Sequence, residues 1–137
     1  MLTRLQEMPM KAKQRPISPF MIGPYYKPQL TSIMSITHRA SGVFLSLIGA
    51  PLLMWWLIAV SNGPEAYQTM QDCLGGLVGS LIVIASVFCL SFHFLNGIRH
   101  LVWDTGRALD IESAYKLGWM VLAGSILLTI VLLGVLL

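Results

Sequence analysis

Charged residues are scarce in this chain of 137 residues: 11% are Asp, Glu, Lys or Arg, against roughly 25% in an ordinary soluble domain. Hydrophobic residues make up 55%. This composition indicates a membrane protein, whose helices pack in lipid through small and polar side chains. The net charge of +3 comes from residues that flank apolar segments. It therefore indicates membrane topology, and no nucleic-acid partner is expected.

Cysteines and known catalytic motifs are equally scarce. Cys73 and Cys89 are the only cysteines, and without metal-ligand spacing they predict neither a disulfide framework nor a cysteine metal site. The sequence contains no nucleophile–base set, phosphate-binding loop, dinucleotide fingerprint or zinc motif. We therefore expect no catalytic residue here and no self-contained dehydrogenase. Any redox chemistry that the chain serves needs partner subunits.

The first 30 residues lack the apolar core of a signal peptide. They are polar and interrupted by prolines, so we interpret 1–30 as an N-terminal arm outside the bilayer and 31–137 as a membrane-anchor domain. A long leader rich in Arg and Ser is also missing. We therefore expect a multi-pass protein of the bacterial inner membrane, or of the mitochondrial inner membrane if the source is eukaryotic.

Three stretches contain no charged side chain: 40–64, 73–98 and 117–137. Crossing the hydrocarbon takes about 20 helical residues, so the sequence predicts an all-α membrane protein with three transmembrane helices, at about 31–60, 75–101 and 114–137. Continuous rather than alternating apolar runs exclude β-barrel strands. We expect the first helix to begin near Thr31 or Ser32 with a hydroxyl cap and to bend at Pro51.

Basic residues are distributed unevenly around these segments. The loop between the first two has none, whereas basic residues occur before the first segment and between the second and third. The positive-inside rule then places the N-terminus on the cytoplasmic or matrix side. The residues that carry this argument are Arg4, Lys11, Lys13, Arg15, Lys27, Arg39, Arg99, Arg107 and Lys116.

The stretch 93–104 carries ionisable residues at the end of the second helix. His93 and His100 are seven residues apart, so they share a helix face with Gly97, which leaves room for a flat macrocycle or a close helix. A neutral imidazole in an apolar setting is a good haem-iron ligand, but His93 alone fits equally well a histidine hydrogen-bonded across helices. Arg99 and His100 could donate hydrogen bonds to an anion such as the haem propionates. For Arg99 alone, however, we favour simple snorkelling of its side chain to the headgroups.

A second polar cluster, 35–42, begins the first helix. Ser35 and Arg39 are four residues apart on one face, and the predicted topology places them at the same side of the membrane as His93. A hydroxyl and a guanidinium that converge there could hydrogen-bond a quinone carbonyl. Alternatively, Ser35 caps or packs while Arg39 contacts headgroups.

Three motifs in this order resemble the cytochrome b membrane-anchor family of succinate dehydrogenase (complex II). They are Arg15-Pro16-Ile17-Ser18-Pro19 followed by Tyr26-Lys27, then Ser35-Ile36-Thr37-His38-Arg39-Ala40-Ser41-Gly42, then the stretch 93–104, which ends Trp103-Asp104. The resemblance implies a helical bundle with a second small anchor subunit, one shared haem b, and docking of an iron–sulfur subunit and a flavoprotein. Electrons from succinate would pass through FAD and iron–sulfur clusters to ubiquinone.

The resemblance also implies roles for individual residues. His93 would be one axial ligand of the haem iron, with the other from the partner anchor. Ser35 and Arg39 would lie at the ubiquinone site, and His38, Arg39 and His100 near the haem propionates. A quinol:fumarate reductase anchor and a haem-free structural anchor remain alternatives. A transporter subunit would spread titratable groups across the membrane depth, whereas here they gather at one side.

Overall fold

The computed structural model describes residues 27–136, and within this range the chain is helical with short turns and no strand. Three helices are long and apolar enough to cross a membrane: Leu30–Asn62, Leu77–Asp104 and Ile111–Val135. The prediction of an all-α protein with three transmembrane helices is therefore confirmed. The predictions made for residues 1–26 of the arm lie outside the described residues.

The first span consists of α1 (Leu30–Phe44), a π-helical turn (Leu45–Gly49) and α2 (Ala50–Asn62). The expected hydroxyl cap is wrong, because α1 begins at Leu30 after Gln29, whose side chain makes no capping bond. The first turn is closed when the Ile33 N–H donates to the Gln29 carbonyl at 3.0 Å. Thr31 therefore falls inside the helix, where its hydroxyl cannot serve as the cap.

Proline explains the π-helical turn. The Ala50 N–H donates to the Leu45 carbonyl, five residues back, directly before Pro51. A proline inside a helix has no N–H to donate, and its ring crowds the carbonyl four residues earlier. A widened turn is one of the ways in which a helix accommodates such a break. The irregularity expected at Pro51 thus lies immediately upstream of it.

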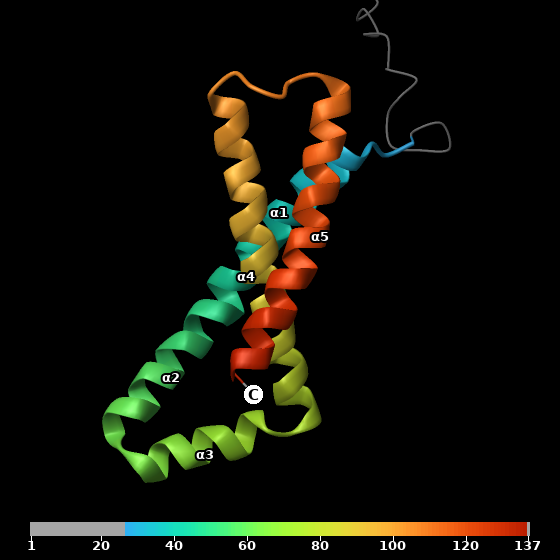
Figure 1. Ribbon diagram of the computed structural model, residues 1–137. Coiled ribbons are helices and arrows are strands. Elements are labelled where there is room, and N and C mark those ends of the chain that lie inside the picture. Colours follow the sequence, from blue (N-terminus) through green and yellow to red (C-terminus); the bar gives the residue numbers. More distant parts are fainter. Residues whose placement is uncertain (1–26, 137) are drawn as a thin grey trace, which may run out of the picture.

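An additional helix, α3 (Pro64–Leu74), connects the first span to the second and lies across that end of the molecule (Figure 1). The sequence analysis did not predict it, because it is short and partly polar. Gly63, at φ +101°, separates it from α2, and Pro64 occupies its first turn. Gly79 allows the chain to turn tightly from α3 into the next helix. A Cβ at this position would lie 2.5 Å from the Leu74 Cα atom.

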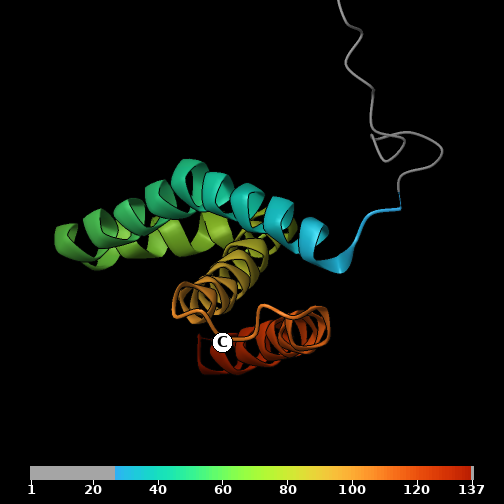
Figure 2. The same ribbon diagram turned by 90° about the horizontal axis from the view of Figure 1, so that it is seen from above.

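The second and third spans are α4 (Leu77–Asp104) and α5 (Ile111–Leu136), joined by a short connection. Figure 2 shows α4 between the first span and α5, and α4 contacts both. The core is small, and each span contributes one buried residue to it: Met34, Phe92 and Val121. The fold therefore brings the polar start of α1 beside the polar end of α4.

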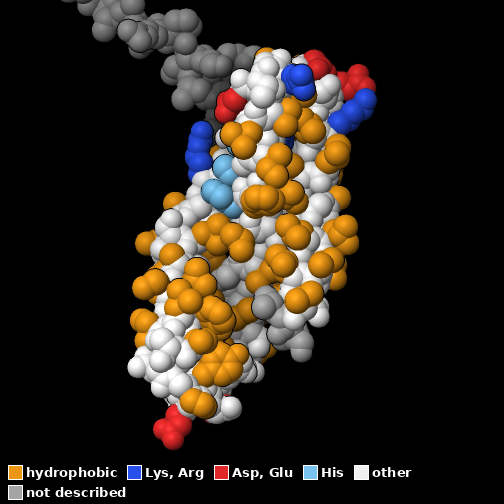
Figure 3. Space-filling model, turned by 60° about the vertical axis from the view of Figure 1, so that its left-hand side comes forward, with side chains coloured by type: hydrophobic (Ala, Val, Ile, Leu, Met, Phe, Trp, Pro, Cys, Tyr) orange, Lys and Arg blue, Asp and Glu red, His pale blue; other side chains and the backbone are white. Residues whose placement is uncertain are grey.

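Most apolar side chains point outward. Figure 3 shows them as a broad belt over the middle of the molecule, with charged side chains at the two ends and histidines just below the more heavily charged end. Such a surface suits lipid or other transmembrane helices, because apolar groups in contact with lipid need no burial inside the chain.

Candidate functional site

The crossing of α1 and α4 is held by two histidines. His38 Nε2 lies 3.2 Å from the His93 carbonyl oxygen, and His93 Nδ1 lies 3.1 Å from the His38 carbonyl oxygen. The two imidazoles are stacked, with ring centroids 4.0 Å apart and planes 20° from parallel. Each ring thus bonds the backbone of the other residue, and the two helices are fixed in register at this level.

Ser41 determines how the His93 ring is protonated. Its Oγ lies 2.8 Å from the His38 carbonyl oxygen and 3.0 Å from His93 Nδ1. A carbonyl only accepts, so the serine hydroxyl donates to it and His93 Nδ1 must carry the proton that the same carbonyl and the serine oxygen accept. If Nδ1 were unprotonated, its lone pair would face the carbonyl oxygen. The network therefore assigns the Nδ1–H tautomer to His93 and leaves the lone pair of its Nε2 free.

Gly42 leaves the space that the His93 ring occupies. A Cβ at this position would lie 2.9 Å from His93 Cε1, closer than real Cβ contacts. Gly97, which we expected to leave room for a flat macrocycle or a close helix, is less confined, because its Cβ would meet only His38 Nε2 at 4.0 Å. Ser41 and Gly42 were thus missed as contacts of His93, although the sequence placed both in the same polar cluster.

Ser35, Arg39 and His100 line one groove of about 390 Å³ at the end of the molecule where α1 begins and α4 ends. Ser35 is half-buried and Arg39 is exposed. The His100 ring lies 5.2 Å from the ring of His38 and meets Trp103 edge-on at 5.3 Å, so it stands between the groove and the histidine pair. The predicted site residues therefore form two adjacent groups.

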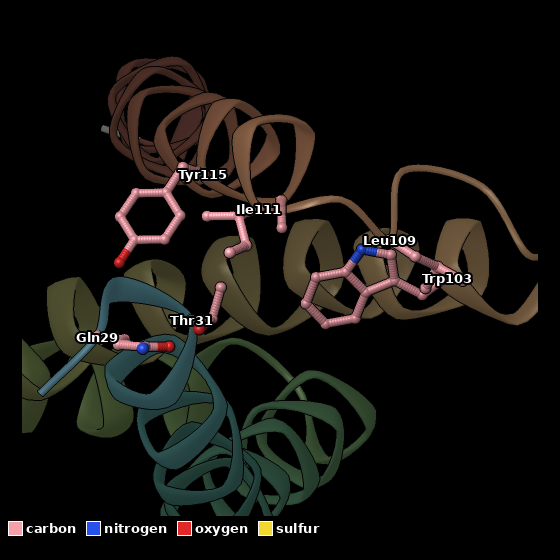
Figure 4. A pocket seen from close by; sticks show the side chains of 7 residues that line it. Gln29, Thr31, Trp103, Leu109, Ile111 and Tyr115 are labelled. Atoms are coloured by element: carbon pink, nitrogen blue, oxygen red, sulfur yellow. The ribbon is translucent and has the colours of Figure 1, made fainter.

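A second cavity, of about 330 Å³, lies between the starts of α1 and α5 and the end of α4. Figure 4 shows Trp103 and Tyr115 on its walls, with Gln29 at the start of α1. It shares Thr31 and Trp103 with the groove, but none of the predicted site residues lines it.

The expectation that Arg99 snorkels to the headgroups is wrong. Its side chain is only 2% exposed and points toward α5. The guanidinium donates to the Ala114 carbonyl at 3.1 Å and to Asn96 Oδ1 at 3.4 Å, and its central carbon lies 4.1 Å from the centre of the Trp103 ring. Arg99 lies on a different face of α4 from His100, so it ties α4 to α5 rather than extending to the surface.

The free nitrogen of His93 suits a haem better than a bare metal ion. Within residues 27–136, no three His, Cys, Asp or Glu side chains are grouped closely enough to hold a metal ion. A haem iron, in contrast, takes a single neutral imidazole on each side. Haem-binding histidines in proteins commonly donate their other N–H to a carbonyl, as His93 does here. The residues present therefore fit a haem, whose iron His93 would ligate through Nε2.

Comparison with known proteins identifies the family of the chain. Residues 11–132 match the family described as Succinate dehydrogenase/Fumarate reductase transmembrane subunit. The succinate dehydrogenase cytochrome b556 subunit of Rickettsia conorii is 37% identical over 119 residues, covering 87% of this chain and 90% of that protein.

Two further relatives extend the comparison to a second bacterium and to mitochondria. The subunit of the same name from Paracoccus denitrificans is 35% identical, over 85% of this chain and 87% of its own length. The mitochondrial succinate dehydrogenase cytochrome B subunit of Schizosaccharomyces pombe is 35% identical, over 82% of this chain and 64% of its own length. With the three apolar spans, these relatives support a multi-pass inner-membrane location. The chain belongs to the family of succinate dehydrogenase and fumarate reductase transmembrane subunits.

Proposed function

We propose that this chain is the larger, cytochrome b-type membrane anchor of a succinate:quinone oxidoreductase, complex II. It is part of an oxidoreductase complex by family, and it contributes no dehydrogenase active site of its own. The three relatives reported above are all named succinate dehydrogenase subunits, which favours oxidation of succinate over the fumarate reductase alternative within the same family.

His93 would ligate the iron of a haem b through Nε2. The observation that carries this proposal is the hydrogen-bond network that protonates His93 Nδ1 and leaves Nε2 free. His38 is not the second ligand, because its Nε2 bonds the His93 carbonyl and its ring is in direct contact with that of His93, with no room for a macrocycle between them. The other ligand therefore comes from the partner anchor. When bound, the haem supplies a reversible one-electron carrier.

The groove beside the histidines is the quinone site. The Ser35 hydroxyl and the Arg39 guanidinium line it together and are both hydrogen-bond donors. Reduction of ubiquinone adds two electrons and two protons, and negative charge gathers on the carbonyl oxygens as electrons arrive. Donors aimed at such an oxygen stabilise that charge. His100 and Arg39 line the wall toward the histidine pair, which suits contact with haem propionates from this side.

The charge distribution supports the side of the membrane on which the soluble partners would dock. The connection between α4 and α5, which carries Arg107, and the start of α1 lie at the same end of the molecule, and the positive-inside rule assigns this end to the cytoplasm or matrix. The iron–sulfur subunit and the FAD-carrying flavoprotein dock there, beside the groove. The second small anchor packs against the exposed apolar belt within the bilayer and completes the helical bundle.

A visible spectrum of the complex tests the haem assignment. The whole complex is purified in mild detergent as the native form and with His93→Ala or His100→Ala, and dithionite-reduced minus oxidised spectra are recorded. We expect a b-type band in the native complex and its loss with His93→Ala. With His100→Ala the band should persist, at equal or lower haem content, because a propionate contact does not ligate the iron. An unchanged band in His93→Ala would exclude this ligand. Absence of haem from an intact native complex would favour the haem-free anchor.

A further inference from the structure

Ser41 differs from the other hydroxyl residues of the spans. It is 5% exposed, and its Oγ contacts both the His38 carbonyl on its own helix and His93 Nδ1 on α4. Nine other serine and threonine hydroxyls among the described residues instead donate to a carbonyl three or four residues back along the chain. The contact with His93 is therefore more than the usual way of satisfying a buried hydroxyl.

We propose that Ser41 is a positioning residue for the His93 ligand and that it sets the electron-donating strength of that imidazole. This inference rests on the proposed role of His93 as a haem ligand, and it adds a determinant of the haem's redox potential.

The physical reason is the sharing of one proton. His93 Nδ1–H has two acceptors, the serine oxygen at 3.0 Å and the His38 carbonyl at 3.1 Å. Because the serine hydroxyl itself donates to that carbonyl, its oxygen becomes a better acceptor. Withdrawing the Nδ1 proton toward these oxygens makes Nε2 a more basic ligand, and a more basic ligand favours the oxidised iron. The same two bonds also restrict rotation of the ring.

Removing the serine hydroxyl should therefore weaken the imidazole as a donor. We expect Ser41→Ala to lower the preference of the site for ferric over ferrous haem by up to tenfold, which raises the midpoint potential by up to about 59 mV for a one-electron couple. We also expect haem affinity to fall, within the 10- to 100-fold range seen when partners of metal-binding histidines are removed.

The experiment uses the purified complex and a matched control. Ser91→Ala removes another buried serine, 1% exposed, whose hydroxyl bonds the Val87 carbonyl of its own helix at 2.9 Å. Both variants are assayed for haem content per flavin, for midpoint potential by redox titration, and for succinate oxidation with an artificial dye as a check of assembly. A raised potential in Ser41→Ala, with native values in Ser91→Ala and in the hydroxyl-retaining Ser41→Thr, supports the proposal.

The outcomes separate this inference from the proposed function. If the native haem depends on His93 but Ser41→Ala has the same potential as Ser91→Ala, Ser41 has no such role and the haem assignment stands. If no haem depends on His93, the proposed function itself fails. Should Ser41→Ala not assemble, Ser41→Cys replaces the hydroxyl with a weak acceptor of similar size. Its potential should rise, and a native value would overturn the inference.

Discussion

Replacing Gly42 by alanine should displace the His93 ring. The added Cβ would lie 2.9 Å from His93 Cε1 and 3.5 Å from Nδ1, whereas ordinary contacts are 3.4–4 Å. The ring must therefore retreat from α1 by roughly 0.5 Å or more. Because the His38 ring belongs to α1 as well, this retreat also disturbs the stacking of the two rings, whose centroids lie 4.0 Å apart.

The retreat lengthens both bonds of Nδ1, now 3.0 and 3.1 Å, to about the 3.5 Å at which a hydrogen bond is lost. Overpacking a well-filled contact costs about 1–3 kcal/mol, and each weakened bond about 0.5–1.5 kcal/mol. Alanine gains up to about 1 kcal/mol over glycine as a helix former. We therefore expect Gly42→Ala to destabilise the α1–α4 contact by about 1–4 kcal/mol and to reduce haem affinity at least tenfold.

The assay is haem content per flavin in the purified complex, with Gly134→Ala as the control. Both substitutions add one methyl group to a glycine inside a transmembrane helix, but at Gly134 in α5 the methyl meets no atom within 4 Å. The control should therefore keep native haem content. Equal haem content and equal band position in the two variants would refute the argument, because the close approach of Gly42 to His93 would then have no energetic consequence.

Three further outcomes follow from individual contacts. Arg39→Ala should reduce quinone turnover more than assembly, measured as succinate:quinone activity per flavin; normal turnover would exclude Arg39 from the site. Arg99→Lys should cost about 1–3 kcal/mol in thermal unfolding of the complex, because an ammonium cannot reproduce the buried planar fork that bonds the Ala114 carbonyl. The Ser113 backbone N–H donates to the Asp110 carboxylate at 2.8 Å and lowers the pKa of that carboxyl. Since a lowered pKa stabilises the fold above the unfolded-state value, this contribution should be complete above about pH 4 and be lost as pH falls further; Asp110→Asn should lose that pH dependence in unfolding curves.

The three spans could be predicted because a helix that crosses lipid needs a long uncharged run, and such a run is visible in the sequence itself. Two details of the first span, Leu30–Asn62, cannot be predicted from its apolar run alone: where it begins and where its helix is irregular. Its start depends on the backbone of Gln29, and its π-helical turn depends on how the helix accommodates Pro51. α3 was missed because an 11-residue amphipathic helix gives a weak signal beside three strongly apolar segments.

For the proposed site, the sequence could predict only which residues lie close together on one helix, because helical spacing determines this. Ser35 and Arg39 lie one turn apart, and the structure finds them in one groove. The contacts of His93 are different, because Ser41 and His93 are 52 residues apart and meet only through the angle at which α1 crosses α4. Arg99 illustrates the same limit. Its inward turn depends on the Ala114 carbonyl of the next helix, which no pattern within α4 reveals.

The helix α1 carries both parts of the proposed site in successive turns. Ser35 and Arg39 line the groove, and the next turn supplies Ser41 and Gly42 to the His93 ring. Both parts therefore depend on one regular stretch of helix and on its crossing with α4. The π-helical turn begins at Leu45, just beyond Gly42, so the irregularity that accompanies Pro51 is confined to the part of the span that holds neither group. A proline closer to Gly42 would bring this irregularity to the crossing itself, where the bonds between His38 and His93 require each ring to reach the backbone of the opposite helix.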